Sequence, residues 1–123
     1  MALIAIIDDS KLSRTFGAAS LKQAGHEVVE FEPSGLDAVV ARLREVKPTL
    51  MVLDQQMPAF LGSSLVRVCF EDEALATIKV LMLTAHRDAE LEQRMAKLGV
   101  RGFLHKPAGP AELNKAVAAL LEQ

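Results

Sequence analysis

The amino-acid sequence predicts an open, doubly wound α/β fold, in which helices cover both faces of a parallel β-sheet. Short apolar runs alternate with longer amphipathic stretches about five times along 123 residues. This alternation is typical of β-α repeats, because the crossover between parallel strands usually contains a helix. Right-handed crossovers place helices on both faces of the sheet. An eight-fold barrel needs about 250 residues, so the sheet is expected to be open.

Five segments are expected to be strands, namely residues 3–7, 28–31, 50–53, 80–83 and 103–104. The first, third and fourth are continuously apolar, as expected of strands that are buried on both faces of a parallel sheet. The second and fifth are weaker candidates, and Gly102 directly precedes the fifth. The sequence therefore predicts a sheet with a strongly apolar centre.

Five helices are expected between and after these strands, at residues 11–24, 36–46, 66–70, 91–98 and 110–120. The second is the clearest, because Leu36, Val39 and Val40 begin an i, i+3, i+4, i+7 pattern of apolar residues. Gly99 is the expected C-cap of the fourth helix, and Pro110 lies near the first turn of the last. Gly17 weakens the prediction of the first helix through its entropic cost.

Composition and charge exclude several classes of protein. Half of the residues are apolar, and no apolar run approaches the roughly 20 residues that span a bilayer. Fourteen basic and 16 acidic residues give a net charge of −2, which predicts neither a nucleic-acid nor a membrane partner. The N-terminus does not resemble a signal peptide, and a single cysteine agrees with a reducing compartment. We therefore expect one domain, residues 1–123, in the cytoplasm.

Polar side chains stand where the apolar runs end. The first run ends at Asp8 and Asp9, the third at Asp54 and the fourth at Thr84, and Lys106 follows the fifth after one histidine. In a parallel sheet these ends share the carboxyl edge, where open α/β proteins bind their ligands. Each residue alone has an ordinary explanation as a helix cap or a surface charge. Their joint occurrence predicts one site.

The chemistry of this set is consistent with phosphoryl transfer. Crowded carboxylates raise one another's pKa unless a cation lies among them, and Mg²⁺ suits carboxylates, waters and a phosphate oxygen. Lys106 and Thr84 would contact phosphoryl oxygens as charged and neutral donors. Asp54 would act as the nucleophile and form an aspartyl phosphate.

These residues resemble the receiver domain of bacterial response regulators over essentially the whole chain. The similarity rests on the ordered set Asp8-Asp9, Asp54-Gln-Gln-Met-Pro58, Gly62, Thr84-Ala85 and Lys106-Pro107. It implies a flavodoxin-like (βα)5 fold with strand order 2-1-3-4-5, as in the chemotaxis receiver that exemplifies this topology. It also implies that the Lys106-Pro107 peptide bond is cis.

The resemblance implies a role for each residue of the set. Asp54 would accept the phosphoryl group. Asp8 and Asp9 would hold Mg²⁺ together with Asp54 and the backbone carbonyl of Gln56. Thr84 and Lys106 would contact the phosphoryl oxygens.

The resemblance also implies a conformational switch. Thr84 and Phe103 would be the switch residues that remodel the face formed by the fourth helix, fifth strand and fifth helix. Core packing is the alternative interpretation of Phe103. Gln56 and His86 occupy positions similar to those that tune hydrolysis in the family. The sequence departs from the family pattern at Leu61, where an acidic residue is frequent, and at Ala108, where a bulky apolar residue is common.

The remaining reactive side chains predict no second site. His26, His86 and His105 lack metal-ligand spacing, which argues against a zinc site. Cys69 lies on an apolar helix face and is expected in the core.

Two other functions fit the sequence less well than the receiver does. A haloacid-dehalogenase-like phosphatase also uses an aspartyl nucleophile, but its DxDxT pattern follows the first strand. Asp54 instead follows the third strand and precedes two glutamines. A flavin or nucleotide binder would need a glycine-rich or hydroxyl-rich phosphate loop after the first strand, where Asp8 and Asp9 repel phosphate.

The receiver would act as a signalling module and catalyse only its own phosphorylation and slow dephosphorylation. Its expected partners are a sensor histidine kinase or histidine phosphotransfer protein and a downstream protein target. A phosphorylation-dependent homodimer through the switch face is a further expectation. Two arrangements remain open, a stand-alone receiver and the N-terminal receiver of a longer regulator, and the first is preferred.

Overall fold

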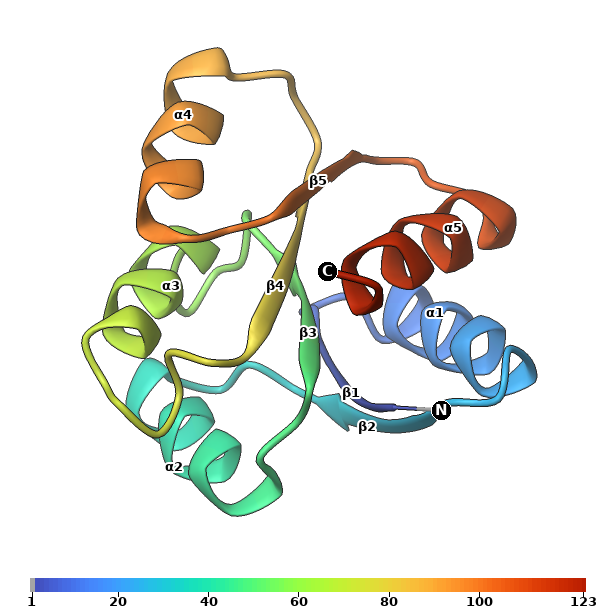
Figure 1. Cartoon of the computed structure of the whole chain (residues 1–123), viewed down its shortest axis with the longest axis horizontal. Coiled ribbons are helices and arrows are strands. Elements are labelled where there is room, and N and C mark those ends of the chain that lie inside the picture. The colour runs from blue at the N-terminus through green and yellow to red at the C-terminus, as the bar shows by residue number, and fades with distance from the viewer. Residues whose placement is uncertain (1) are drawn as a thin grey trace.

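A computed structural model of the chain describes residues 2–123 and contains five strands and five helices in strict alternation (Figure 1). The elements are β1 (Leu3–Ile7), α1 (Lys11–Gln23), β2 (Glu27–Phe31), α2 (Leu36–Val46), β3 (Leu50–Asp54), α3 (Gly62–Phe70), β4 (Lys79–Thr84), α4 (Ala89–Leu98), β5 (Gly102–His105) and α5 (Pro110–Leu121). Every predicted strand and helix is confirmed, and the bounds differ by a few residues. Asp54 and Thr84 belong to the strands they were expected to follow.

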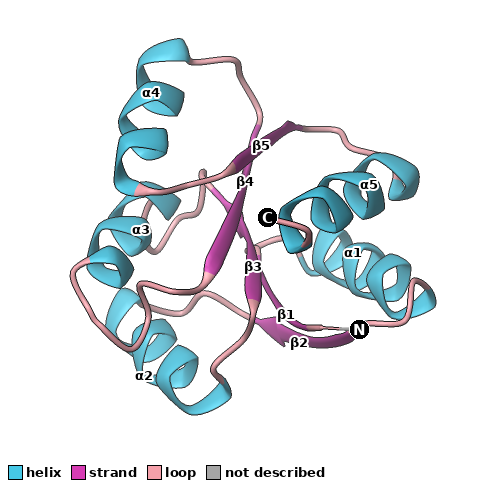
Figure 2. Ribbon diagram, in the orientation of Figure 1, coloured by secondary structure: helices cyan, strands magenta, loops and turns pink. Residues whose placement is uncertain are grey.

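The five strands form one parallel sheet in the order β2-β1-β3-β4-β5, as expected (Figure 2). From β1 the chain first moves outward to β2 and then returns across β1 to β3. The carboxyl ends of β1 and β3 therefore flank the point at which the strand order reverses. Open α/β sheets bind their ligands at this position.

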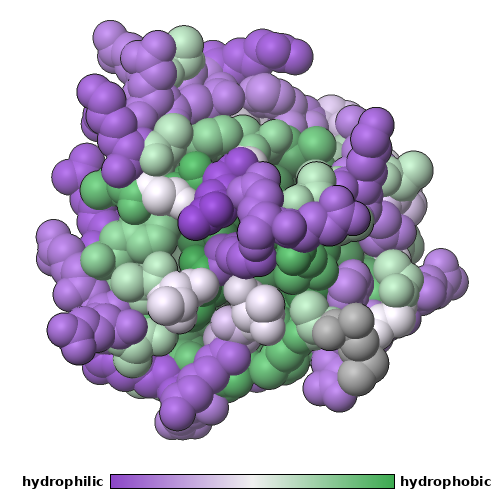
Figure 3. All heavy atoms as spheres, in the orientation of Figure 1, coloured by the Kyte–Doolittle hydropathy of each residue, from purple (hydrophilic) through white to green (hydrophobic). Residues whose placement is uncertain are grey.

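The sheet separates two apolar cores, because successive side chains of a strand point to opposite faces. Ile4 and Ile6 of β1 pack with α1 and α5, whereas Ala5 and Ile7 pack with α2, α3 and α4. The two helix layers lie on either side of the sheet in Figure 1. In the same view, polar side chains dominate the rim and apolar ones show between the helices (Figure 3). The central strands are buried on both faces, which explains their continuously apolar sequences.

Local signals in the sequence set several helix ends. The hydroxyl of Ser10 accepts a hydrogen bond from the Ser13 amide and caps α1, and the Asp88 carboxylate caps α4 in the same way. Gly99 ends α4 in the left-handed region at φ 119°, which confirms the predicted C-cap. Across residues 2–123, every helix is too short or too polar to cross a membrane.

Candidate functional site

The carboxyl edge of the sheet brings three acidic side chains together. Asp8 follows β1, Asp9 comes next, and Asp54 is the last residue of β3. One carboxylate oxygen from each lies within 4.8 Å of the others. Asp8 and Asp54 are 2% and 4% exposed, whereas Asp9 is exposed. The cluster therefore has two buried walls and one side that faces solvent.

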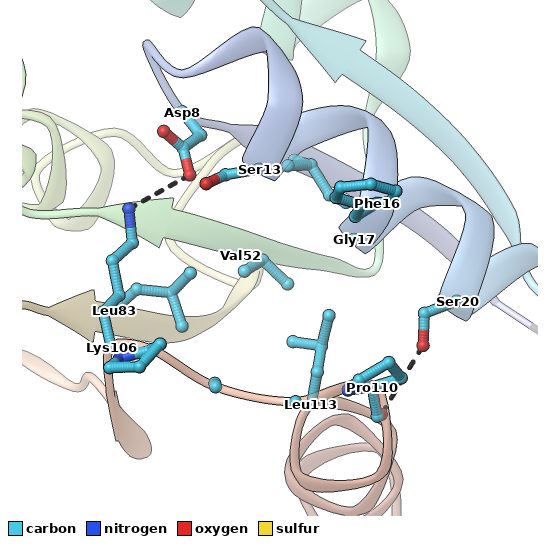
Figure 4. A pocket seen from close by; sticks show the side chains of 14 residues that line it. Asp8, Ser13, Phe16, Gly17, Ser20, Val52, Leu83, Lys106, Pro110 and Leu113 are labelled. Carbon is cyan, nitrogen blue, oxygen red and sulfur yellow. Dashed lines mark hydrogen bonds and ion pairs between the residues drawn. The ribbon is translucent and has the colours of Figure 1, made fainter.

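Lys106 supplies a positive charge within this acidic cluster. Its Nζ lies 3.2 Å from Asp8 Oδ2 and 3.2 Å from Asp54 Oδ2. Figure 4 shows the side chain reaching from the β5–α5 connection toward Asp8. The Lys106-Pro107 peptide bond is cis, as expected. One ammonium group therefore bridges the two buried carboxylates.

The charges of the cluster do not balance within the protein. Burial raises the pKa of Asp54, the positive charge of Lys106 lowers it, and the negative charge of Asp8 raises it. The balance of these effects is a pKa of about 6 for Asp54. Burial lowers the pKa of Lys106, but the charges of Asp54 and Asp8 raise it above its ordinary value overall. Three carboxylates thus face one ammonium group, and the site favours an additional cation.

The donor set fits a small, hard divalent ion. Such an ion prefers carboxylate and carbonyl oxygens and retains several waters, and this cluster offers three carboxylates, one of them exposed. Gln56 is exposed two residues after Asp54, and its amide donates to Asp54 Oδ1 over 3.4 Å. The acidic cluster is therefore consistent with the metal site of a receiver domain.

Thr84 lies on the same edge of the sheet, at the end of β4. The residue is 3% exposed, and its Oγ1 has no hydrogen-bond partner among the described residues. A buried hydroxyl without a partner is unfavourable, because it loses its bonds to water without replacement. Thr84 therefore holds a free hydrogen-bonding group at the edge that carries the acidic cluster.

The other predicted residues lie around this edge. Phe103 on β5 is half-buried and packs against the core beneath α4. His86 is exposed in the β4–α4 connection. His105 ends β5 and lies 3.6 Å from Glu92 Oε2 of α4. Cys69 is fully buried in the core, as expected.

Sequence reasoning missed a buried arginine behind the acidic cluster. Arg14 on α1 is 7% exposed, and its Nη1 donates to the Asp8 carbonyl over 2.6 Å. Its Nε lies 3.6 Å from Glu30 Oε1 of β2. Arg14 shares the buried face of α1 with Ala18 and Leu21. A charged residue at an apolar position of a helix is the signal that could have found it.

A second missed residue, Gln55, fastens the loop after Asp54. The residue is 5% exposed. Its Oε1 accepts a hydrogen bond from the Ser63 amide over 2.7 Å, and its Nε2 donates one to Ser63 Oγ over 3.2 Å. Its carbonyl accepts from the Gly62 amide over 3.0 Å. A Cβ at Gly62 would lie 2.6 Å from the Asp54 carbonyl oxygen, so only glycine permits this approach. The loop is therefore packed against the backbone of the acidic site.

An open α/β sheet with an acidic cluster at its reversal point and one bridging lysine defines a phospho-accepting signalling module. A family model for the response regulator receiver domain matches residues 4–118. The chain belongs to the response regulator receiver domain family. Its acidic pocket of Asp8, Asp9 and Asp54 serves phospho-accepting two-component signalling, and the domain is a signalling module rather than a catalytic enzyme.

Similar proteins differ in length. The chain is 32% identical over 122 residues to Protein PilH of Pseudomonas aeruginosa, and covers 98% of both sequences. It is 31% identical over 120 residues to the phosphate regulon transcriptional regulatory protein PhoB of the same organism, with 98% of this chain but 52% of that protein covered. The chain thus spans about half the length of PhoB. Among solved structures, Vibrio cholerae chemotaxis protein CheY4 superposes with a TM-score of 0.89 at 26% identity and 98% coverage of each chain.

Proposed function

We propose that Asp54 accepts a phosphoryl group in a Mg²⁺-dependent reaction. The observation that carries this proposal is the cluster itself, in which Asp8, Asp9 and Asp54 lie within 4.8 Å and Lys106 bridges two of them at 3.2 Å. Family membership supports the phosphoacceptor role, and the position of Asp54 at the end of β3 supports its assignment.

Asp8, Asp9 and Asp54, with the backbone carbonyl of Gln56, would hold the Mg²⁺ ion. The bound ion supplies positive charge that neutralises phosphoryl oxygens in a crowded acidic site. Arg14 and Gln55 would position these ligands, because one donates to the Asp8 carbonyl and the other fastens the loop that contains Gln56.

The chain's own residues would carry the covalent step. A carboxylate oxygen of Asp54 attacks phosphorus, the bond from phosphorus to the donor's imidazole nitrogen breaks, and its electron pair stays with the imidazole. Lys106 and Thr84 hold the phosphoryl oxygens as donors. Thr84 is suited to this role because its buried hydroxyl otherwise has no partner among the described residues. Gln56 and His86 would tune hydrolysis from exposed positions near the site.

The signal would leave through the α4-β5-α5 face. When Thr84 moves toward a phosphoryl oxygen, the half-buried ring of Phe103 on the adjacent strand β5 follows, and α4 and α5 repack. Partners would be a histidine kinase or phosphotransfer protein, a protein target in the cytoplasm, and a second copy of the chain in a phosphorylation-dependent dimer. Residues 1–123 would form the whole receiver domain. A stand-alone receiver and the receiver of a longer regulator are both compatible with it.

Intact-mass spectrometry tests this proposal. After incubation with acetyl phosphate, the wild type is expected to gain one phosphoryl group with Mg²⁺ and none with chelator. Asp54→Asn is expected to gain none in either buffer, whereas Asp37→Asn, which changes a residue of the first turn of α2, should behave as the wild type. An adduct that persists without Mg²⁺, or on Asp54→Asn, would contradict the proposal.

A further inference from the structure

A cleft of about 480 Å³ lies between α1 and α5, beside the acidic cluster (Figure 4). Its floor is the apolar face of the sheet, contributed by Ile6, Val52 and Leu83. Phe16 of α1 and Leu113 of α5 form its walls. Pockets of about 300 to 1,000 Å³ with mainly apolar linings are typical of small-molecule sites. This cleft has the size and the lining of such a site.

Small residues in the β5–α5 connection keep the cleft open. Ala108 and Gly109 line it directly after Pro107, and neither has a side chain larger than a methyl group. A Cβ at Gly109 would meet only Glu112 Oε1, at 3.8 Å, so this backbone is not packed against the opposite wall. Exposed Phe16 stands at the rim, with 66% of its surface accessible. The chain thus leaves apolar surface uncovered where a larger residue would cover it.

The polar groups of the cleft lie at its two ends. Lys106 and Asp8 stand at one end, with Ser13 beside them (Figure 4). Ser20 stands at the other end, where its hydroxyl has two acceptors, Asn114 Oδ1 at 3.2 Å and the Pro110 carbonyl oxygen at 3.5 Å. An ammonium group has three N–H donors, and the carboxylates of Asp8 and Asp54 account for two of those on Lys106. A third N–H is left for an acceptor on a bound molecule. The two carboxylates beside it disfavour an anion.

We infer that this cleft binds a small, uncharged and mainly apolar molecule with one carbonyl-type oxygen directed at Lys106. The apolar body would cover Val52, Leu83 and Leu113, and the oxygen would accept from Nζ. This ligand class follows from the lining. The apolar floor stabilises a molecule that buries apolar surface on it, and the single ammonium group of Lys106 can donate a hydrogen bond to one acceptor on that molecule.

Occupancy of the cleft is coupled to phosphorylation, and this part of the inference rests on the proposed function. Lys106 and Asp8 line the cleft and also belong to the acidic cluster. A ligand oxygen on Lys106 competes with the phosphoryl oxygen for the same ammonium group. The bound molecule therefore slows phosphorylation of Asp54, and phosphorylation in turn weakens binding of the molecule.

Binding is tested with Prodan, an uncharged naphthalene ketone whose emission shifts to the blue in apolar surroundings. The chain has no Trp or Tyr, so intrinsic fluorescence does not interfere. The wild type is expected to bind the dye saturably at one site. Ala108→Leu fills the cleft and is expected to weaken binding at least tenfold. Ala119→Leu makes the same change at an exposed position of α5 outside the cleft, and should bind as the wild type.

Methyl NMR of the wild type locates the dye without any substitution. Chemical-shift changes are expected at Ile6, Val52, Leu83 and Leu113, and thermal melts of each variant verify folding. No saturable binding, unchanged binding by folded Ala108→Leu, or shifts confined to another part of the protein would overturn the site. These titrations contain neither Mg²⁺ nor phosphodonor, so they do not depend on the phosphoacceptor proposal.

A separate measurement tests the coupling between binding in the cleft and phosphorylation of Asp54. Saturating Prodan is expected to slow adduct formation from acetyl phosphate several-fold in the wild type and to leave the Ala108→Leu rate unchanged. An equal rate with and without dye in the wild type would overturn the coupling. A protein that forms no adduct even without dye would instead contradict the proposed function.

Discussion

The Lys106→Met variant is expected to bind Mg²⁺ several-fold more tightly than the wild type and to become phosphorylated about a hundredfold more slowly. The two effects have opposite signs because Lys106 has two roles. Its ammonium group lies 3.2 Å from both Asp8 and Asp54, so it offsets part of the negative charge that attracts the metal ion. The same group would neutralise a phosphoryl oxygen during transfer, and methionine has no charge to replace it.

Calorimetry measures the Mg²⁺ affinity, and the time course of the intact mass with acetyl phosphate at saturating Mg²⁺ measures the rate. Lys115→Met removes an exposed charge from α5 and serves as the matched control, with both quantities unchanged. Weaker Mg²⁺ binding by Lys106→Met, or a phosphorylation rate equal to that of the wild type, would exclude the two roles assigned to this lysine.

In Mg²⁺-free buffer, Asp54→Asn is expected to be more stable than the wild type at neutral pH. Its advantage in the free energy of unfolding should grow by about 2 to 3 kcal/mol between pH 4 and pH 7. Burial, opposed by Lys106 and reinforced by Asp8, raises the pKa of Asp54 from 3.8 to about 6. Folding therefore favours the protonated acid. Its contribution to stability is fully present below pH 3.8 and is lost as the pH rises through about 6, whereas asparagine has no proton to lose.

Urea unfolding followed by far-UV circular dichroism checks this dependence, because the chain has no Trp or Tyr for fluorescence. Glu73→Gln removes an exposed carboxylate from the α3–β4 connection, at the opposite edge of the sheet. Its difference from the wild type in the free energy of unfolding should not grow between pH 4 and pH 7. Mg²⁺ should stabilise the wild type at pH 7 more than Asp54→Asn, since it binds the folded acidic cluster. A stability difference that is constant from pH 4 to pH 7 would contradict a buried, uncompensated Asp54.

The fold was predictable because its determinants are local. Segments such as Leu50–Leu53 are continuously apolar and are bounded by polar residues, so their burial on both faces follows from sequence order. The sequence also predicted that the polar residues at the strand ends lie together, because parallel strands share one carboxyl edge. These residues are Asp8, Asp54, Thr84 and Lys106. The strand order could be predicted only from the resemblance to the family, because many orders of five parallel strands satisfy the same sequence pattern.

The remaining features depend on distances between elements that a sequence pattern does not specify. Arg14 lies on the apolar face of α1 in the sequence pattern, but its hydrogen bond to the Asp8 carbonyl depends on how α1 packs against the end of β1. The sequence predicts Gln55 only as a polar loop residue. Its hydrogen bonds to Ser63 depend on how the loop folds back toward α3. The raised pKa of Asp54 depends on how deeply β3 is buried. The cleft beside Ala108 requires the spacing of α1 and α5.

The phosphoacceptor role of Asp54 is tested most directly by locating the acyl phosphate. Borohydride reduces an aspartyl phosphate to homoserine, and peptide sequencing by mass spectrometry then reports the modified position. After treatment with acetyl phosphate and Mg²⁺, homoserine is expected at position 54 and at no other aspartate. Homoserine at position 8 or 9, or a phosphoryl group on another residue of the wild type, would contradict the assignment of Asp54 as the acceptor.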